Sequence, residues 1–265
     1  MSLRRTFLIL LSLLLVIFLN ACQDIQGLEK NLITKNTKIG NEVELPFDCI
    51  TVSGENALET CLRLREYYKG KITPVILGKF DDLQTLADVF TNNKGSTEDI
   101  IKKSLEYKAE NLIKRRLEED IEFYNSIELG EWPSTLSPNS SITANKDILT
   151  GKFLEKVYIG LIPTGNPYEV PAYVKFGGWN ACPAPEEQVA ILRYWYDKYG
   201  AQVISMTFDI IECTVENPPK TKEESLALAK EQFIYCSDIV TQGTGTISDL
   251  ADSLYKSKYW FFWWD

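Results

Sequence analysis

The amino-terminal end carries one nearly uninterrupted apolar run. Residues 7–19 are apolar apart from Ser12, and Arg4 and Arg5 precede them. A helix needs about 20 apolar residues to cross the hydrocarbon core of a bilayer, so this run is short for a transmembrane anchor. A positive start followed by a shorter apolar run is the pattern of a secretory signal peptide. We therefore expect residues 1–21 to be a leader that is removed, rather than an uncleaved signal anchor.

Beyond the leader, segments with apolar residues at helical spacing alternate with segments that have the spacing of a strand. Helical spacing predicts helices over residues 57–68 and 81–90, and a β-rich run lies at 72–77 between them. Residues 96–99 have the pattern of a capping box, which marks the start of a helix. Apolar residues at helical spacing follow it and predict one long helix to residue 124. The part of the chain at 41–129 is therefore expected to be rich in helices.

Residues 130–151 are rich in Pro, Ser, Asn and Thr, which predicts a loop or hinge. The remainder, 152–265, again mixes both kinds of element. The predicted strands are 157–162, 172–176 and material within 203–215, and the predicted helices begin near Pro185, Thr221 and Thr246. This alternation predicts an α/β or α+β fold with a mixed central sheet flanked by helices.

The four residues that end the leader, Leu19-Asn20-Ala21-Cys22, resemble the bacterial lipobox. The resemblance implies that Cys22 is acylated and becomes the first residue of the mature chain. Several acyl chains on one residue give stable attachment to a bilayer. We expect the protein to be anchored through Cys22 to the cell membrane or the outer membrane, outside the cytoplasm. Residues 22–40, which are polar and lack a strong periodicity, would be a flexible lipidated tether.

Charge and composition narrow the function. Removing the leader takes away Arg4 and Arg5 and no acid, so the net charge of −9 becomes −11. Nucleic acid is therefore not expected as a partner. The chain contains no histidine, which excludes Ser-His-Asp and Cys-His nucleophiles and histidine-containing zinc sites. No metal ion or other cofactor is predicted.

The cysteines that remain after Cys22 are odd in number, so at least one thiol cannot pair with another in the chain. We expect mostly buried reduced thiols, with one disulfide possible. These cysteines are Cys49, Cys61, Cys182, Cys213 and Cys236.

Several strings in the second half resemble a bacterial family catalogued as domain of unknown function 4253. They are FGGWNACP at 176–183, RYW at 193–195, PP at 218–219, EQFIYC at 231–236, DIV at 238–240 and WFFWWD at 260–265. The resemblance extends over about residues 158–265 and is thin before them. It implies a shared fold and no particular activity, and members of the family often lack a leader.

Cys182 is the best single candidate for chemistry. It lies between Gly177-Gly178 and a predicted helix start, where a helix dipole can lower the pKa of a thiol. The segment could form a reactive thiolate or a backbone anion nest. The alternative is a structural turn that holds a semi-buried thiol beside Trp179.

Acidic residues in the second half could converge for acid–base chemistry or for binding a hard cation. The alternative for those in a first helical turn is stabilisation of the helix dipole. These acids are Glu186, Glu187, Asp209, Glu212, Asp238 and Asp265.

The aromatic end of the chain has two interpretations. As a central strand with both faces covered, residues 259–265 would belong to the core. As a strand with one open face, they would form a platform on which a sugar or peptide could stack. Asp265 adds two carboxylates near the indole of Trp264.

These observations favour a surface-anchored binding or interaction module for an unknown protein or small-molecule ligand. The candidate ligand-binding residues are Gly177, Gly178, Trp179, Glu186, Asp238, Trp264 and Asp265. The alternative is an enzyme that uses Cys182 or a carboxylate pair in a cleft between the parts at 41–129 and 152–265.

Overall fold

The computed structural model of the protein describes residues 38–39 and 43–265. The predicted leader and Cys22 lie outside this part of the chain. Of the predicted tether, only Lys38 and Ile39 are described. Those residues form β1 (Lys38–Ile39), which pairs with β2 (Val43–Glu44) in an antiparallel ladder. Within the described residues, no helix is long and apolar enough to cross a membrane.

A six-stranded sheet forms the centre of the molecule, in the order β3-β5-β4-β6-β7-β8. The neighbours β4 and β6 are parallel, and the other neighbours in this sheet are antiparallel. The predicted mixed sheet is therefore confirmed, with an α+β arrangement. The strands are β3 (Asp48–Val52), β4 (Thr73–Ile76), β5 (Val157–Ile162), β6 (Ala201–Met206), β7 (Ile210–Val215) and β8 (Tyr259–Trp263).

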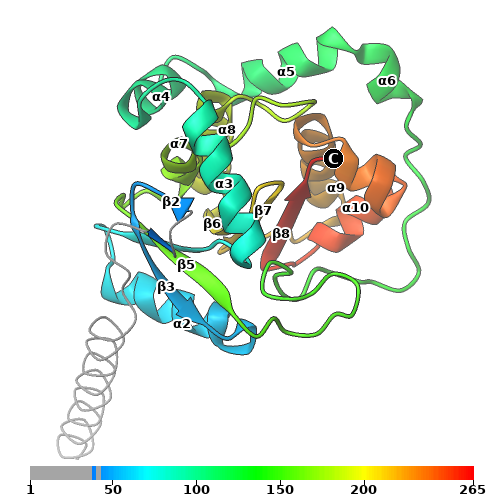
Figure 1. The fold of residues 1–265 in the computed structure, drawn as a ribbon. Coiled ribbons are helices and arrows are strands. Elements are labelled where there is room, and N and C mark those ends of the chain that lie inside the picture. Colours follow the sequence, from blue (N-terminus) through cyan, green and yellow to red (C-terminus); the bar gives the residue numbers. More distant parts are fainter. Residues whose placement is uncertain (1–37, 40–42) are drawn as a thin grey trace, which may run out of the picture.

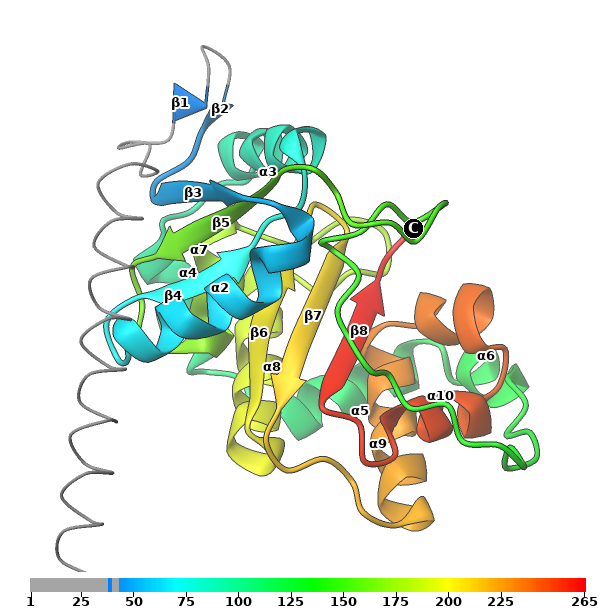
Figure 2. The ribbon, with the colours of Figure 1, turned by 90° about the horizontal axis from the view of Figure 1, so that it is seen from below.

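Helices cover both faces of this sheet. On one face lies α2 (Gly54–Tyr67), and most other helices lie on the opposite face or around its rim (Figures 1 and 2). Successive side chains of β4 point to opposite faces of the sheet, and both faces are covered. Ile76 packs in the cluster with α2, while Val75 belongs to the core on the other face. The remaining helices are α3 (Phe80–Asn92), α4 (Thr97–Ser104), α5 (Ala109–Glu119), α6 (Ile121–Ser126), α7 (Val170–Val174), α8 (Pro185–Tyr199), α9 (Lys222–Tyr235) and α10 (Ile247–Leu254), with short turns η2 (Pro167–Glu169) and η3 (Ile239–Thr244).

The single long helix predicted to residue 124 is wrong, since three helices, α4, α5 and α6, occupy this segment. Ile100 of α4 packs with Val189 of α8, while Leu112 of α5 joins the main core. A straight helix could not bring both residues to these places. Two residues of the predicted stripe, Leu105 and Ile121, are exposed at the breaks.

The strand predicted at 172–176 is also wrong, because residues Val170–Val174 form the helix α7. Pro171 occupies the first turn, where its fixed φ suits a helix and its missing N–H costs no hydrogen bond. The segment is buried on several sides, so packing outweighs the β propensity of its valines.

Residues 130–151 form an irregular segment that is tied to the sheet and to α10. The Ser137 N–H donates to the carboxylate of Asp252 at 2.8 Å, and the Ser257 hydroxyl donates to the Asn139 carbonyl at 2.8 Å. Strands from both sides of this segment belong to the same sheet, since β3 and β4 precede it in the sequence and β5 to β8 follow it. The parts on either side therefore share one sheet.

The aromatic end of the chain forms β8 at the edge of this sheet, beside β7, and not in its centre. Trp260, Phe262 and Trp264 are fully buried against α8 and α9. Tyr259, Phe261 and Trp263 point to the other face and are half-buried. The interpretation as a central strand is therefore wrong, although one face of β8 does belong to the core.

Replacing Phe262 with alanine should destabilise the fold strongly, because its ring is buried and stacks on Trp195 with centroids 5.4 Å apart. We expect a loss of about 3–5 kcal/mol in the free energy of unfolding. The matched control is Phe261→Ala, one position along the same strand on the half-buried face, where the loss should be clearly smaller. Urea unfolding monitored by circular dichroism measures both, and equal losses would contradict this arrangement.

Candidate ligand-binding site

The glycines of the FGGWNACP segment form a tight turn. Gly177 and Gly178 have φ of +114° and +86°, and a side chain at Gly177 would collide with the carbonyl of Pro183. The Gly178 N–H donates to the Pro183 carbonyl at 3.0 Å. This donor is therefore already used within the turn, which weakens the interpretation as an anion nest.

Cys182 lies inside the protein, with only 5% of its surface exposed. The side-chain amide of Gln188 donates to its sulfur at 3.3 Å, and Gln188 also accepts a hydrogen bond from the Tyr235 hydroxyl. Burial raises the pKa of the Cys182 thiol far above its usual range, although α8 begins three residues later. This environment favours the structural interpretation of Cys182. Cys61, Cys213 and Cys236 are likewise buried free thiols, as predicted.

Several of the predicted ligand-binding residues do meet at the carboxyl end of the chain. The Asn180 side chain donates to the Asp265 carbonyl at 2.6 Å, and the Asp265 N–H donates to the Asp238 carboxylate at 3.0 Å. The buried Trp264 contacts Phe176, which in turn contacts Trp179. These contacts attach the end of β8 to the glycine turn and to the residue before η3. Gly177, Gly178, Trp179, Asp238, Trp264 and Asp265 therefore form one cluster.

Glu186 is not oriented toward this cluster. Its carboxylate forms an ion pair with Lys103 of α4, and the neighbouring Glu187 forms one with Arg115 of α5. Both acids therefore connect α8 to the helices that pack on it.

A pocket opens where the parallel strands β4 and β6 end. It has a volume of about 240 Å³, and carboxyl ends of adjacent parallel strands are a common place for ligands in α/β sheets. After β4, Gly78 turns the chain into α3 with φ of +78°, where a side chain would collide with the Asp82 carboxylate. The lining residues are Lys79, Asp82, Thr143, Ala144, Lys146, Asp147, Ile148, Leu154, Thr207, Phe208, Asp209 and Ile210.

Two carboxylates in this pocket, those of Asp82 and Asp209, come from distant parts of the sequence. Asp82 accepts a hydrogen bond from the Lys79 N–H at 2.9 Å, and burial raises its pKa, with the negative charge of Asp209 adding to the rise. Burial also raises the pKa of Asp209, although Thr207 and Trp263 donate to its two oxygens at 2.9 and 3.1 Å. Each acid thus lies in a place that opposes its charged form.

The wall formed by Thr143 and Ala144 is held by a third acid, the buried Glu212 of β7. Its carboxylate accepts hydrogen bonds from the Thr143 N–H at 2.6 Å, the Thr143 hydroxyl at 2.9 Å and the Ala144 N–H at 3.2 Å, and also from the Ser205 hydroxyl. Burial raises the pKa of Glu212. With its oxygens engaged in this way, Glu212 positions the wall and does not face a ligand.

Of the residues that line the pocket, the sequence pointed to Asp209 and missed the others. A signal for Asp82 existed, because a buried strand at 72–77 is followed by Gly78, Lys79, Phe80 and then two acids. No sequence pattern indicated that the segment at 143–148 would lie beside them. Among the described residues, no group of three or more acids and thiols is placed to hold a metal ion.

Comparison with known families identifies the second part of the chain. Residues 158–265 match the family described as Domain of unknown function (DUF4253). This match confirms the resemblance seen in the sequence for that region. Comparisons with curated proteins and with solved structures give no match. The pocket is therefore composite, because Asp209 lies in the DUF4253 region and Asp82 lies before it.

Replacing Asp82 with asparagine should raise Tm by a few degrees at neutral pH. Because the pKa of Asp82 is raised in the folded protein, its ionisation costs stability, and this cost appears as the pH rises from the unfolded value of about 3.9 through the folded value. The variant should lose that part of the pH dependence. Its Tm should equal or fall below that of the wild type at low pH and exceed it at neutral pH.

The matched control is Asp81→Asn, because the Asp81 side chain is 77% exposed and lies one position earlier in the same helix. This variant should keep the wild-type pH dependence. Thermal unfolding at several pH values compares the three proteins. A lower Tm for Asp82→Asn than for the wild type at neutral pH would contradict the unfavourable burial of this charge.

Proposed function

We propose that the protein is a membrane-anchored lipoprotein whose folded body is a binding module, and that its ligand occupies the pocket at the ends of β4 and β6. The anchor is supported by Leu19-Asn20-Ala21-Cys22 after a short apolar leader. The binding role is supported by one observation above all. Two acids with raised pKa, supplied by separate parts of the chain, line one pocket with apolar side chains.

The chemistry of the pocket favours a ligand that joins a cationic group to an apolar part. Asp82 and Asp209 supply negative charge, while Ile148, Leu154 and Phe208 supply apolar surface. The lysines have partners of their own, since Lys146 donates to the Ser141 hydroxyl at 3.0 Å and Lys79 lies 3.7 Å from the Asp81 carboxylate. A cation that ion-pairs with the two acids would also relieve their unfavourable burial.

The anchor predicts that full-length protein expressed in a bacterium incorporates a palmitate analogue at Cys22. The matched control is Cys22→Ser, which should remove the label and release the protein from the membrane fraction. The cysteines of the folded body are buried, so they should not take up the label in either protein. Incorporation that survives Cys22→Ser would contradict the anchor.

The pocket predicts binding of primary alkylamines, with an affinity that rises with chain length from butylamine to octylamine. Thermal shift of the mature lipoprotein in detergent measures this binding. Asp209→Asn should remove most of the shift, because the variant loses one of the two charges, while Asp81→Asn should leave it unchanged. Equal shifts in all three proteins would show that the amines bind elsewhere.

The alternative is that the protein is an enzyme. Asp82 and Asp209 favour this alternative, whereas the buried Cys182 does not. Asp82 precedes the loop at 130–151 and Asp209 follows it, so together they form a carboxylate pair between the two predicted parts. Neighbouring carboxyl groups whose environments shift their pKa values can act as acid and base. Turnover in a panel of hydrolase substrates, abolished by both Asp82→Asn and Asp209→Asn, would replace the binding role with this one.

A further inference from the structure

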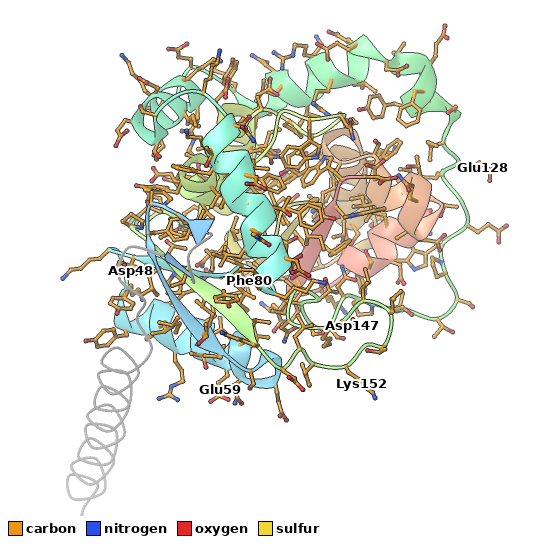
Figure 3. The ribbon with its side chains drawn as sticks, viewed as in Figure 1. Asp48, Glu59, Phe80, Glu128, Asp147 and Lys152 are labelled. Carbon is orange, nitrogen blue, oxygen red and sulfur yellow. The ribbon has the colours of Figure 1, made fainter. Side chains whose placement is uncertain are left out.

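Two consecutive aliphatic side chains project from the rim of the pocket. Ile148 and Leu149 are 85% and 92% exposed, and Phe153 nearby is 50% exposed. Single exposed apolar residues are common on protein surfaces. A group of them on one loop indicates a surface that contacts something else. We refer to residues 146–153 as the tip loop, and Figure 3 shows Asp147 and Lys152 on it at the edge of the molecule.

The tip loop is held in shape by its own hydrogen bonds. Asp147 accepts hydrogen bonds from the N–H and the hydroxyl of Thr150, at 2.8 and 2.7 Å. The Asp147 N–H donates to the Lys152 carbonyl at 2.8 Å, and Lys146 pairs with Phe153 across the turn. These bonds close the turn at its base, so Ile148 and Leu149 are presented outward by an ordered backbone. A preorganised loop loses little conformational entropy when it binds.

The charges around the tip suit a phospholipid surface. Lys146 and Lys152 flank the aliphatic pair, so the loop carries two positive charges against the single carboxylate of Asp147, which accepts hydrogen bonds from Thr150. Aliphatic residues that enter the acyl boundary, with lysines at the level of the phosphates, are the pattern of interfacial membrane contacts. The mature chain as a whole has a net charge of −11, so attraction of the entire body to an anionic bilayer cannot supply this contact.

The position of the proposed anchor makes a bilayer the nearest available surface. Residues 23–37 separate Cys22 from the first described residue, and a stretch of this length spans at most about 50 Å. The folded body would therefore remain beside the membrane, where even a weak contact is favoured by the high effective concentration. A small patch of two aliphatic residues is enough in that situation, whereas a stable protein partner needs a far larger interface.

We infer that the tip loop is a membrane-contact element, in which Ile148 and Leu149 enter the interface of the bilayer that holds Cys22. This inference rests on the proposed anchor. Because Ile148 and Phe208 also line the pocket, the contact turns the mouth of the pocket toward the membrane surface. A ligand would then reach Asp82 and Asp209 from the lipid interface and not from bulk solvent.

The test places an environment-sensitive nitrobenzoxadiazole probe on Leu149→Cys in the full-length lipidated protein. Labelling is selective because Cys22 would be acylated and the cysteines of the body are buried. The matched control is the same probe on Leu105→Cys, another exposed leucine (68%) that follows α4. Both proteins are reconstituted in phosphatidylcholine vesicles that contain phosphatidylglycerol and spin-labelled lipid.

We expect blue-shifted emission and quenching by the spin-labelled lipid for the probe at 149, and neither for the probe at 105. Replacing Ile148 with serine should reduce the quenching at 149. Equal quenching at both positions, or none at 149, would overturn the inference. Shielding at 149 that increases with protein concentration and shows no lipid quenching would also overturn it, in favour of contact between copies.

Mass spectrometry of the amino-terminal peptide from the same preparation separates the two proposals. An acylated Cys22 together with an exposed probe at 149 refutes the membrane contact alone. A Cys22 without acyl chains refutes the anchor on which the contact depends, and the inference then falls with it.

Discussion

The structure depends on the parallel pairing of β4 with β6, in which Ile76 lies opposite Ser205. On one side of this pair the chain builds β3, β5 and β4, and on the other side it builds β6, β7 and β8. Because adjacent parallel strands end at the same edge of a sheet, the pairing also brings Gly78 and Thr207 together. The pocket exists only because these two strand ends meet, so fold and candidate site have one cause.

Buried polar groups keep the rest of the molecule in place around this pairing. Glu212 binds the irregular segment at Thr143 and Ala144 through backbone and side-chain donors, and Asp252 binds the same segment further back at Ser137. Such donors satisfy the carboxylate of Glu212, whose burial would otherwise be costly. The segment from which the tip loop projects is therefore attached to the sheet and to α10 by side-chain hydrogen bonds, although it has neither helical nor strand hydrogen bonding over most of its length.

Residues near the end of the chain that resemble the DUF4253 family stabilise the fold by contacts with one another. Asn180, Asp238 and Trp264 together hold β8 against the glycine turn, and Cys182 lies behind this turn beside Gln188. Asp238 and Trp264 are among the candidate ligand-binding residues that the sequence indicated. Their hydrogen bonds, however, are made mainly to one another and to the backbone, so the cluster stabilises an exposed edge of the sheet. Asp209, one of the two acids with unfavourable burial, is instead contacted by Trp263, which points to the other face of β8.

The sequence by itself determined the elements whose signals are local. Pro185 and Gly200 delimit α8, Thr221 and Glu224 cap α9, and the apolar run of β5 reads as a buried strand. It also indicated the DUF4253 region and, through Cys22, a predicted anchor. Only the tertiary structure decided that the helix expected to residue 124 is broken, that 170–174 is helical and that β8 is an edge strand. It alone joined Asp82 to Asp209, because contacts between residues so distant in sequence arise from strand pairing, which no local pattern encodes.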